Sequence, residues 1–173
     1  MGGGDWRFDL AEACNSARRG IHHRNPAWRV VTRESIDFTV EGQLPPKKDG
    51  TNSMWGEHGN FQRLRALRQA AEVAMKGQDP LRRNINLTLE VHCGSSDVRP
   101  GDLDNFITGV CDGLQKASAR CKPNQRWREA PSKIGPQRAI GFENDAEVVS
   151  ISASKTFTTH GPSWYRVVLE GER

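Results

Sequence analysis

The stretch INLTLEVHCGSSDVRPGDLDNFITGVCDGL, residues 85–114, decides the fold. Its first part, 85–93, alternates apolar and polar residues, which predicts a half-buried strand. Its last part, 103–114, repeats apolar residues at helical spacing, which predicts an amphipathic helix. A loop containing glycine and proline separates the two. The stretch therefore predicts a strand–loop–helix unit with Asp102 and Asp104 at the start of the helix.

The same two periodicities recur on either side of this unit. Period-two alternation predicts strands over 36–44, 149–157 and 165–169, and a helical pattern predicts a helix over 61–77. The order strand, helix, strand, helix, strand, strand indicates an α+β fold, a small mixed β-sheet with helices packed on it. The turn at 158–163 predicts a hairpin-like connection between the last two strands. The residues expected to point inward from the first of these strands are Val149, Ile151, Ala153 and Phe157.

Length and composition limit the class of protein. The 173 residues suggest one domain with extensions, and 35% hydrophobic residues are enough for a small core. The net charge of +4 permits an anionic partner such as nucleic acid without demanding one. Four cysteines, none in a C-x-x-C pair, indicate a reduced, cytoplasmic protein. No apolar run approaches the roughly 18 residues of a membrane span, so no membrane association is expected.

Two segments stand outside the predicted sheet and helices. Residues 1–34 are an N-terminal extension to which the sequence assigns no role, with a short helix predicted over 9–20. Residues 35–173 form the main domain, which contains a basic insertion at about 116–143. This insertion holds seven Lys or Arg residues against two Glu and shows no sustained periodicity. A long stretch of this kind is usually functional or disordered. The insertion could therefore either contact nucleic acid or be a solvated loop.

The aspartates at the start of the 103–114 helix have two interpretations. Aspartate there caps backbone N–H groups and complements the helix dipole, worth roughly 0.5–2 kcal/mol per residue. However, two carboxylates in one place repel each other unless a cation lies between them. A third carboxylate, Asp145, stands just before the next strand. Carboxylates from two segments meeting at one edge of a sheet would suit Mg²⁺, which prefers oxygen ligands.

These residues also resemble a known family. GDLDN at 101–105, CDGL at 111–114 and ENDAEVVSISASK at 143–155, in this order, resemble the RusA family of Holliday-junction resolvases. FTVEGQLPPKK at 38–48 resembles the first strand and Pro-Pro loop of that family, and the likeness covers about 36–170. The resemblance implies an endodeoxyribonuclease that uses Mg²⁺, with Mn²⁺ as an alternative. Such an enzyme acts as a homodimer and resolves four-way DNA junctions in recombination and repair by symmetric phosphodiester hydrolysis.

The resemblance also implies roles for individual residues. Asp102, Asp104 and Asp145 would be the catalytic residues and the metal ligands. Asn105 and Asp112 match positions of supporting character in the family.

Two departures from the family pattern lead to alternative hypotheses. Thr108 stands where the family has a lysine that would place positive charge near the scissile phosphate. Asn144 replaces one member of an acidic pair. A non-catalytic DNA-binding protein with the RusA-like fold is therefore the alternative to a nuclease. A third hypothesis is an interaction module in which the aspartates only cap a helix.

DNA contact would depend on Lys and Arg residues distributed over the chain. The helix over 61–77 adds Arg63, Arg65 and Arg68 to those of the insertion. Trp127 in the insertion is an aromatic residue able to stack on an unpaired base. Lys47, Lys48, Arg99 and Lys155 are expected to contact DNA and could also replace the missing lysine. The other residues expected to contact DNA are Arg126, Trp127 and Arg128.

Overall fold

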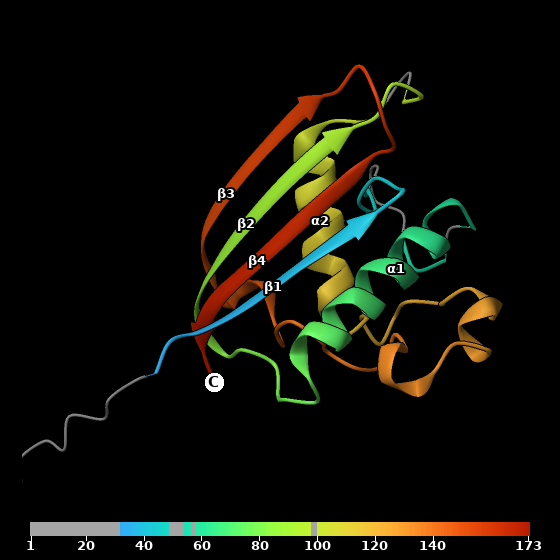
Figure 1. Cartoon of the computed structure of the whole chain (residues 1–173). Coiled ribbons are helices and arrows are strands. Elements are labelled where there is room, and N and C mark those ends of the chain that lie inside the picture. Colours follow the sequence, from blue (N-terminus) through green and yellow to red (C-terminus); the bar gives the residue numbers. More distant parts are fainter. Residues whose placement is uncertain (1–31, 49–53, 57, 98–99) are drawn as a thin grey trace, which may run out of the picture. The chain divides into compact units, whose positions relative to one another are not determined.

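The computed structural model covers the main domain. The residues that it describes are 32–48, 54–56, 58–97 and 100–173 (Figure 1). The extension predicted over 1–34 lies almost wholly outside the described residues, as do the helix predicted over 9–20 and Arg99.

Four strands and two α-helices follow one another along the described chain. Their bounds are β1 Glu34–Glu41, α1 His58–Met75, β2 Arg83–Cys93, α2 Leu103–Leu114, β3 Val148–Phe157 and β4 Trp164–Glu172. Three short 3-10 helices lie between α2 and β3, namely η2 Gln125–Arg128, η3 Ser132–Ile134 and η4 Asp145–Glu147. The prediction of an α+β protein with a mixed sheet is confirmed.

The sheet has the strand order β1–β4–β2–β3, so the last strand of the chain lies in its interior. β4 pairs antiparallel with both β1 and β2, whereas β2 and β3 are parallel. The hairpin predicted at 158–163 is therefore wrong, because β2 lies between β3 and β4. The connection instead crosses the end of β2 at Gly94, where a Cβ atom would come 2.7 Å from the carbonyl oxygen of Gly161.

The two helices cover one face of the sheet, and the core lies between the layers (Figure 1). α1 packs against β1 and α2, and α2 also contacts β3. Alternate residues of β2 are buried while the intervening ones are partly exposed, as expected for a sheet covered on one face. The buried residues of β2 are Ile85, Leu87, Leu89, Val91 and Cys93.

β3 is an edge strand that the helices cover only in part. Val149, Ile151 and Phe157 are 62%, 49% and 67% exposed, so the prediction that they point into the core is wrong. Of the four residues predicted inward, only Ala153 packs against the core. The apolar and polar residues of β3 do alternate, but neither α1 nor α2 extends far enough over this outer strand to bury it.

Two glycines allow α2 to lie close to its neighbours. A Cβ atom on Gly109 would overlap the carbonyl oxygen of Pro46, and one on Gly113 would come 2.7 Å from a methyl group of Leu67. The loop after β1 therefore crosses α2 in direct contact at Gly109, and α1 packs against Gly113. Lys47 and Lys48, which follow Pro46, therefore extend from a fixed point next to Gly109 on α2.

The basic insertion over 116–143 is folded against the rest of the domain. Trp127 is 6% exposed, with its ring centroid 5.3 Å from that of Trp55 and 5.1 Å from that of Phe61. The expectation that Trp127 stacks on an unpaired base is therefore wrong, because protein aromatics already cover its ring. The insertion is also not a solvated loop, since Ile134, Ile140 and Phe142 are buried as well.

Arg68 joins the insertion to both helices. Its side chain is fully buried, which corrects the expectation of a surface cation, and its guanidinium lies 5.0 Å from the ring centroid of Trp55. Burial lowers the pKa of Arg68 to about 9, so it remains a cation at neutral pH. The backbone carbonyls that accept its hydrogen bonds belong to Gly113, Gln115, Ile134, Gly135 and Arg138. The first two lie at the C-terminal end of α2, where carbonyls lack helical partners.

Candidate functional site

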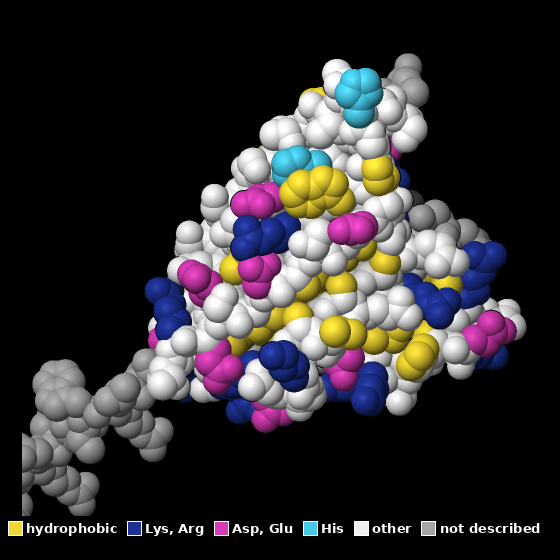
Figure 2. All heavy atoms as spheres, in the orientation of Figure 1, with side chains coloured by type: hydrophobic (Ala, Val, Ile, Leu, Met, Phe, Trp, Pro, Cys, Tyr) yellow, Lys and Arg dark blue, Asp and Glu magenta, His cyan; other side chains and the backbone are white. Residues whose placement is uncertain are grey.

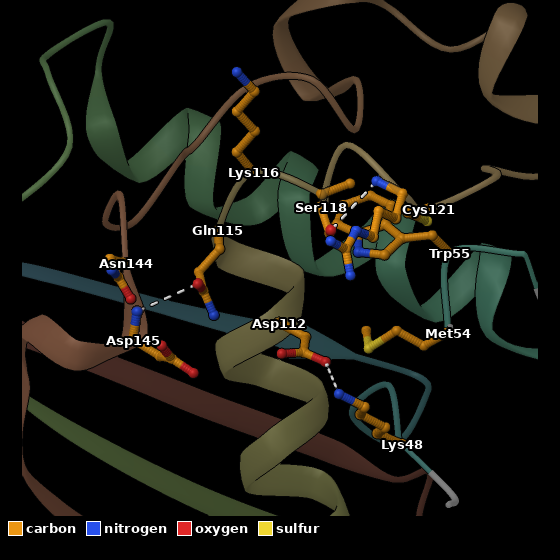
Figure 3. A pocket seen from close by; sticks show the side chains of 12 residues that line it. Lys48, Met54, Trp55, Asp112, Gln115, Lys116, Ser118, Cys121, Asn144 and Asp145 are labelled. Atoms are coloured by element: carbon orange, nitrogen blue, oxygen red, sulfur yellow. Dashed lines mark hydrogen bonds and ion pairs between the residues drawn. The ribbon is translucent and has the colours of Figure 1, made fainter. Parts of the chain in front are cut away.

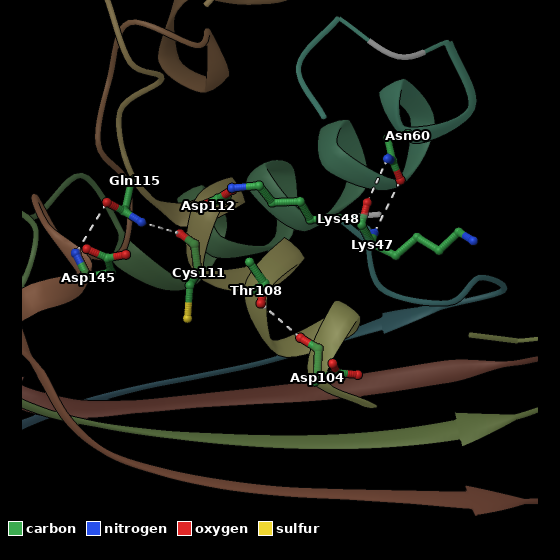
Figure 4. Close-up of polar contacts among 9 residues, drawn as sticks. All are labelled: Lys47, Lys48, Asn60, Asp104, Thr108, Cys111, Asp112, Gln115 and Asp145. Atoms are coloured by element: carbon green, nitrogen blue, oxygen red, sulfur yellow. Dashed lines mark hydrogen bonds and ion pairs between the residues drawn. The ribbon is translucent and has the colours of Figure 1, made fainter. Parts of the chain in front are cut away.

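α2 has carboxylates near both of its ends, and the structure keeps the two groups apart. Asp102 is the N-cap residue and Asp104 lies in the first turn. At the other end, the backbone N–H of Asp145 donates to the side-chain oxygen of Gln115, the C-cap residue, at 3.2 Å. A helix of 12 residues is about 18 Å long, and Figure 4 shows Asp104 near one end of α2 and Asp145 beside its other end.

A single chain therefore does not bring Asp102, Asp104 and Asp145 together. Within the described parts of the chain, no group of three or more His, Cys, Asp or Glu residues could hold a metal ion. The expectation that these carboxylates meet within one subunit is wrong, because the length of α2 separates them. Any role for all three on one ion requires ligands from more than one chain.

At the start of α2, two carboxylates lie beside cations. The side chain of Asp102 makes no capping hydrogen bond, and no ion pair joins Asp102 or Asp104 to another described residue. The Nζ atom of Lys155 donates to the carbonyl oxygen of Gly101 at 2.8 Å. The side chain of Lys47 also passes close to Gly101. This end of the helix thus combines two carboxylates with two lysines from other elements.

Thr108 and Asn105 lie one turn apart on α2. The hydroxyl of Thr108 donates to the backbone carbonyl of Asp104 at 3.0 Å, so this side chain serves the helix backbone. The carbonyl of Asn105 accepts a hydrogen bond from the backbone N–H of Lys48 at 3.2 Å. Lys155 and Lys47 are lysines that the structure places near the start of α2.

Near the end of α2, Asp112 and Asp145 line a common pocket (Figure 3). Asp112 forms an ion pair with Lys48, whose Nζ atom lies 2.8 Å from the carboxylate. Burial raises the pKa of the Cys111 thiol to about 11, with further contributions from the charges of Asp112 and Asp145. Cys111 is therefore a buried residue that is neutral at physiological pH.

A second hollow runs between α2 and β3. Its volume is about 330 Å³, and its apolar walls include Ile107, Val148 and Ile151. Asp112 and Asp145 lie along it as well. The face formed by α2 and β3 therefore exposes apolar side chains and is flanked by carboxylates.

The cations expected to contact DNA fall into two groups. Lys47, Lys48 and Lys155 lie along α2, as described above. Arg126 and Arg128 are exposed on the insertion, with the Arg126 guanidinium 5.9 Å from the ring centroid of Phe61. Arg99 lies outside the described residues.

The helix-free face of the sheet offers no continuous positive surface. Arg166 there pairs with Asp37 at 2.6 Å and lies 3.7 Å from Glu90. This pairing lowers the pKa of Asp37, chiefly through the hydrogen bond from Arg166. Figure 2 shows acidic and basic side chains interspersed on the visible face of the molecule.

Comparison with known proteins assigns no family. No protein-family model matches this sequence, and no curated protein sequence matches it. None of the helices in the described part of the chain is long and apolar enough to cross a membrane. What the protein does is therefore inferred from its motifs and its geometry.

Proposed function

We propose that this protein is a Mg²⁺-dependent endonuclease that acts as a homodimer on branched DNA, with the four-way junction as its substrate. The observation that carries the proposal is the pair Asp102 and Asp104, which lack an ion-pair partner among the described residues and lie beside Lys155 and Lys47. Two carboxylates at one end of a helix that form no ion pair favour a bound cation, and nearby lysines favour a phosphate. The RusA-like order of motifs supports the same reaction.

A dimer resolves the separation of the carboxylates. In a twofold dimer, residue i of one chain meets residue j of the other, and j meets i. If the axis passes near the middle of α2, the start of α2 in one chain faces the end of α2 in its partner. Asp102 and Asp104 would then meet the partner's Asp145, and this would occur twice. Two equivalent sites suit the two symmetric cuts that resolve a four-way junction.

The face between α2 and β3 is the surface such a dimer would bury. Ile151 lines the hollow there and is exposed, and Phe157 is exposed on the same edge strand, which the helices cover only in part. Exposed apolar groups of this kind often mark a protein interface. The carboxylates that flank this face would be brought to the interface with it.

In this proposal each residue has a limited task. Bound Mg²⁺ supplies a polarised phosphoryl oxygen and a water of lowered pKa. Asp102, Asp104 and Asp145 hold the ion and need not act as bases. Lys155 and Lys47 would orient the scissile phosphate by charge, because both lie at the Asp102 end of α2.

The non-catalytic alternative is supported by the two departures from the family pattern. The side chain of Asn144 accepts a hydrogen bond from the backbone N–H of Ala146 at 3.0 Å and thereby caps η4. Thr108 is likewise engaged with the helix backbone. Both side chains serve local structure at positions where the family pattern has charged residues. A DNA-binding protein without hydrolysis would retain this arrangement.

A metal-dependence assay separates the two functions. Purified full-length protein is incubated with a four-way junction, a flap and a linear duplex in Mg²⁺, in Ca²⁺, or with a chelator. We expect junction nicking in Mg²⁺ at least about 10-fold faster than duplex nicking, and none with chelator or Ca²⁺, which accepts looser coordination geometry. Junction binding without nicking in Mg²⁺ selects the non-catalytic alternative. Nicking that resists the chelator contradicts the metal site.

The insertion is expected to contribute electrostatic contacts to DNA. Replacing Arg126 and Arg128 by Gln should make DNA binding less sensitive to salt. The slope of log binding constant against log salt concentration should become less steep by up to about 2, because each phosphate contact contributes about 0.9. The matched control replaces Lys76 and Arg83, two exposed cations on other elements, by Gln. Fluorescence anisotropy with a labelled junction measures both slopes. Equal slopes for the two double variants would reject a contact through the insertion.

A further inference from the structure

The pocket at the C-terminal end of α2 is lined by apolar, carboxamide, basic and acidic side chains (Figure 3). Its volume is about 560 Å³, within the roughly 300–1,000 Å³ typical of small-molecule sites. One side is α2, and another is the first part of the basic insertion. The pocket therefore depends on the insertion.

The apolar wall of the pocket is fixed in place. It includes Met54 and Trp55, which are 1% and 5% exposed. Trp55 contacts the guanidinium of Arg68 and the tilted ring of Trp127. Because these neighbours hold the indole, the wall is already formed before any ligand binds. Little of either side chain is open to solvent, so this wall bounds the pocket rather than offering a ring face for stacking.

Two carboxamides face the same space. Asn144 accepts a hydrogen bond with its side-chain oxygen, which leaves both N–H donors of its amide to a ligand. Gln115 accepts one hydrogen bond from the backbone of Asp145, and a carboxamide oxygen can accept a second. The pocket thus presents a neutral donor and a neutral acceptor. That pairing matches the hydrogen-bonding edge of a nucleobase.

Exposed cations stand at the rim of the pocket. Lys116 and Arg120 line it, and no ion pair joins either to another described residue. Lys48, by contrast, is neutralised by Asp112. The rim therefore favours an anion attached to whatever ring enters the pocket.

We infer that this pocket binds one nucleotide of the DNA substrate, with its base unstacked from the helix and its phosphate held by Lys116 and Arg120. The inference rests on the proposed function for its assumption that the ligand is part of DNA. Unstacking a base costs least where pairing is already broken, as at a branch point. Because Asp145 also lines the pocket, the nucleotide would lie next to the cleaved bond and give the enzyme a base preference there.

The test is a titration with mononucleotides followed by NMR of the side-chain amides of Gln115 and Asn144. The probes are the four deoxynucleoside 5′-monophosphates and the corresponding nucleosides. We expect saturable shifts with a Kd of about 1 mM or below for at least one nucleotide. The nucleoside should bind roughly 5- to 10-fold more weakly, because it lacks the phosphate. This difference should disappear when Lys116 and Arg120 are both replaced by Gln.

A matched pair of variants locates the binding site. Ser118→Phe fills the pocket and should abolish the shifts, whereas Ala119→Phe, an exposed neighbour that does not line the pocket, should leave them unchanged. Absence of saturable shifts in the wild type, or equal effects of the two variants, would overturn the inference. Because no cleavage is measured, a failed titration leaves the nuclease proposal standing. Mononucleotide binding by a protein that never nicks DNA would support the pocket and reject the nuclease.

Discussion

Mixing Asp104→Asn protein with Asp145→Asn protein is expected to restore junction nicking that neither variant has alone. In each pure variant both sites lack one ligand, so nicking should fall at least about 100-fold. In a mixed dimer one site takes an intact Asp104 from one chain and an intact Asp145 from its partner, while the other site lacks both. Random mixing makes about half the dimers mixed and so restores about a quarter of the sites.

The control mixes Asp104→Asn with Asp102→Asn, since these two residues lie at the same end of α2. Every site in that mixture lacks one ligand, so no recovery is expected. Nicking is measured on an end-labelled junction after subunit exchange, and a gel shift checks that DNA binding persists. Mixed dimers should make single nicks rather than paired cuts. Failure of the first mixture to recover, or equal recovery in both mixtures, would contradict a site shared between chains.

Replacing Arg68 by Met is expected to cost at least about 3 kcal/mol of the free energy of unfolding. The substitution leaves the buried carbonyls of Gly113 and Ile134, and three partly buried ones, without this donor, and each fully buried group costs roughly 1–3 kcal/mol. Small domains have only about 5–15 kcal/mol in total, so the loss is a large fraction. Arg68→Lys should fall between wild type and Arg68→Met, because an ammonium keeps the charge but lacks the planar set of donors. Urea unfolding followed by circular dichroism measures the three proteins.

The control for this prediction is Arg65→Met, on the same helix but only partly buried. Its effect should be within about 0.5 kcal/mol, as for most surface substitutions. If Arg68→Met does not fold, limited proteolysis of Arg68→Lys should cleave the insertion faster than the rest of the domain. Equal unfolding midpoints for Arg65→Met and Arg68→Met would show that the hydrogen bonds of Arg68 contribute nothing.

The periodicity of the sequence predicted the elements better than their arrangement. α2 runs over 103–114 as predicted, because its apolar stripe is long and regular. Periodicity carries no information about partners, so the place of β4 inside the sheet could not be predicted from it. The exposure of the β3 side chains could not be predicted for the same reason. An alternating sequence pattern is the same for an edge strand and for a central strand.

The sequence identified candidate ligands but not their separation. A helix that follows a strand runs back along the sheet, so a second, parallel strand starts near the helix C-terminus. Residues that precede β3 must then lie near Gln115 rather than near Asp102. The sequence did not show that β2 and β3 pair in parallel, and this pairing places Asp145 at the far end of α2. Gln115 itself was missed, although a polar amide directly after an apolar helix could have indicated it.

Arg68 was the other residue that sequence reasoning misjudged. It follows Leu64 by four residues and therefore lies on the apolar face of α1. A cation at such a position signals a buried hydrogen-bonding role rather than a surface contact. The same signal was not present for Trp127, whose segment has no periodicity to place it inside or outside.

The contact between Pro46 and Gly109 links two distant parts of the surface. Lys47 leaves this crossing toward Gly101, whereas Lys48 leaves it toward Asp112. Any side chain introduced at Gly109 would push the loop outward and displace both lysines at once. Under the proposed function, substitutions at this glycine should therefore lower nicking as much as the loss of a lysine does, although glycine has no side chain to offer a substrate.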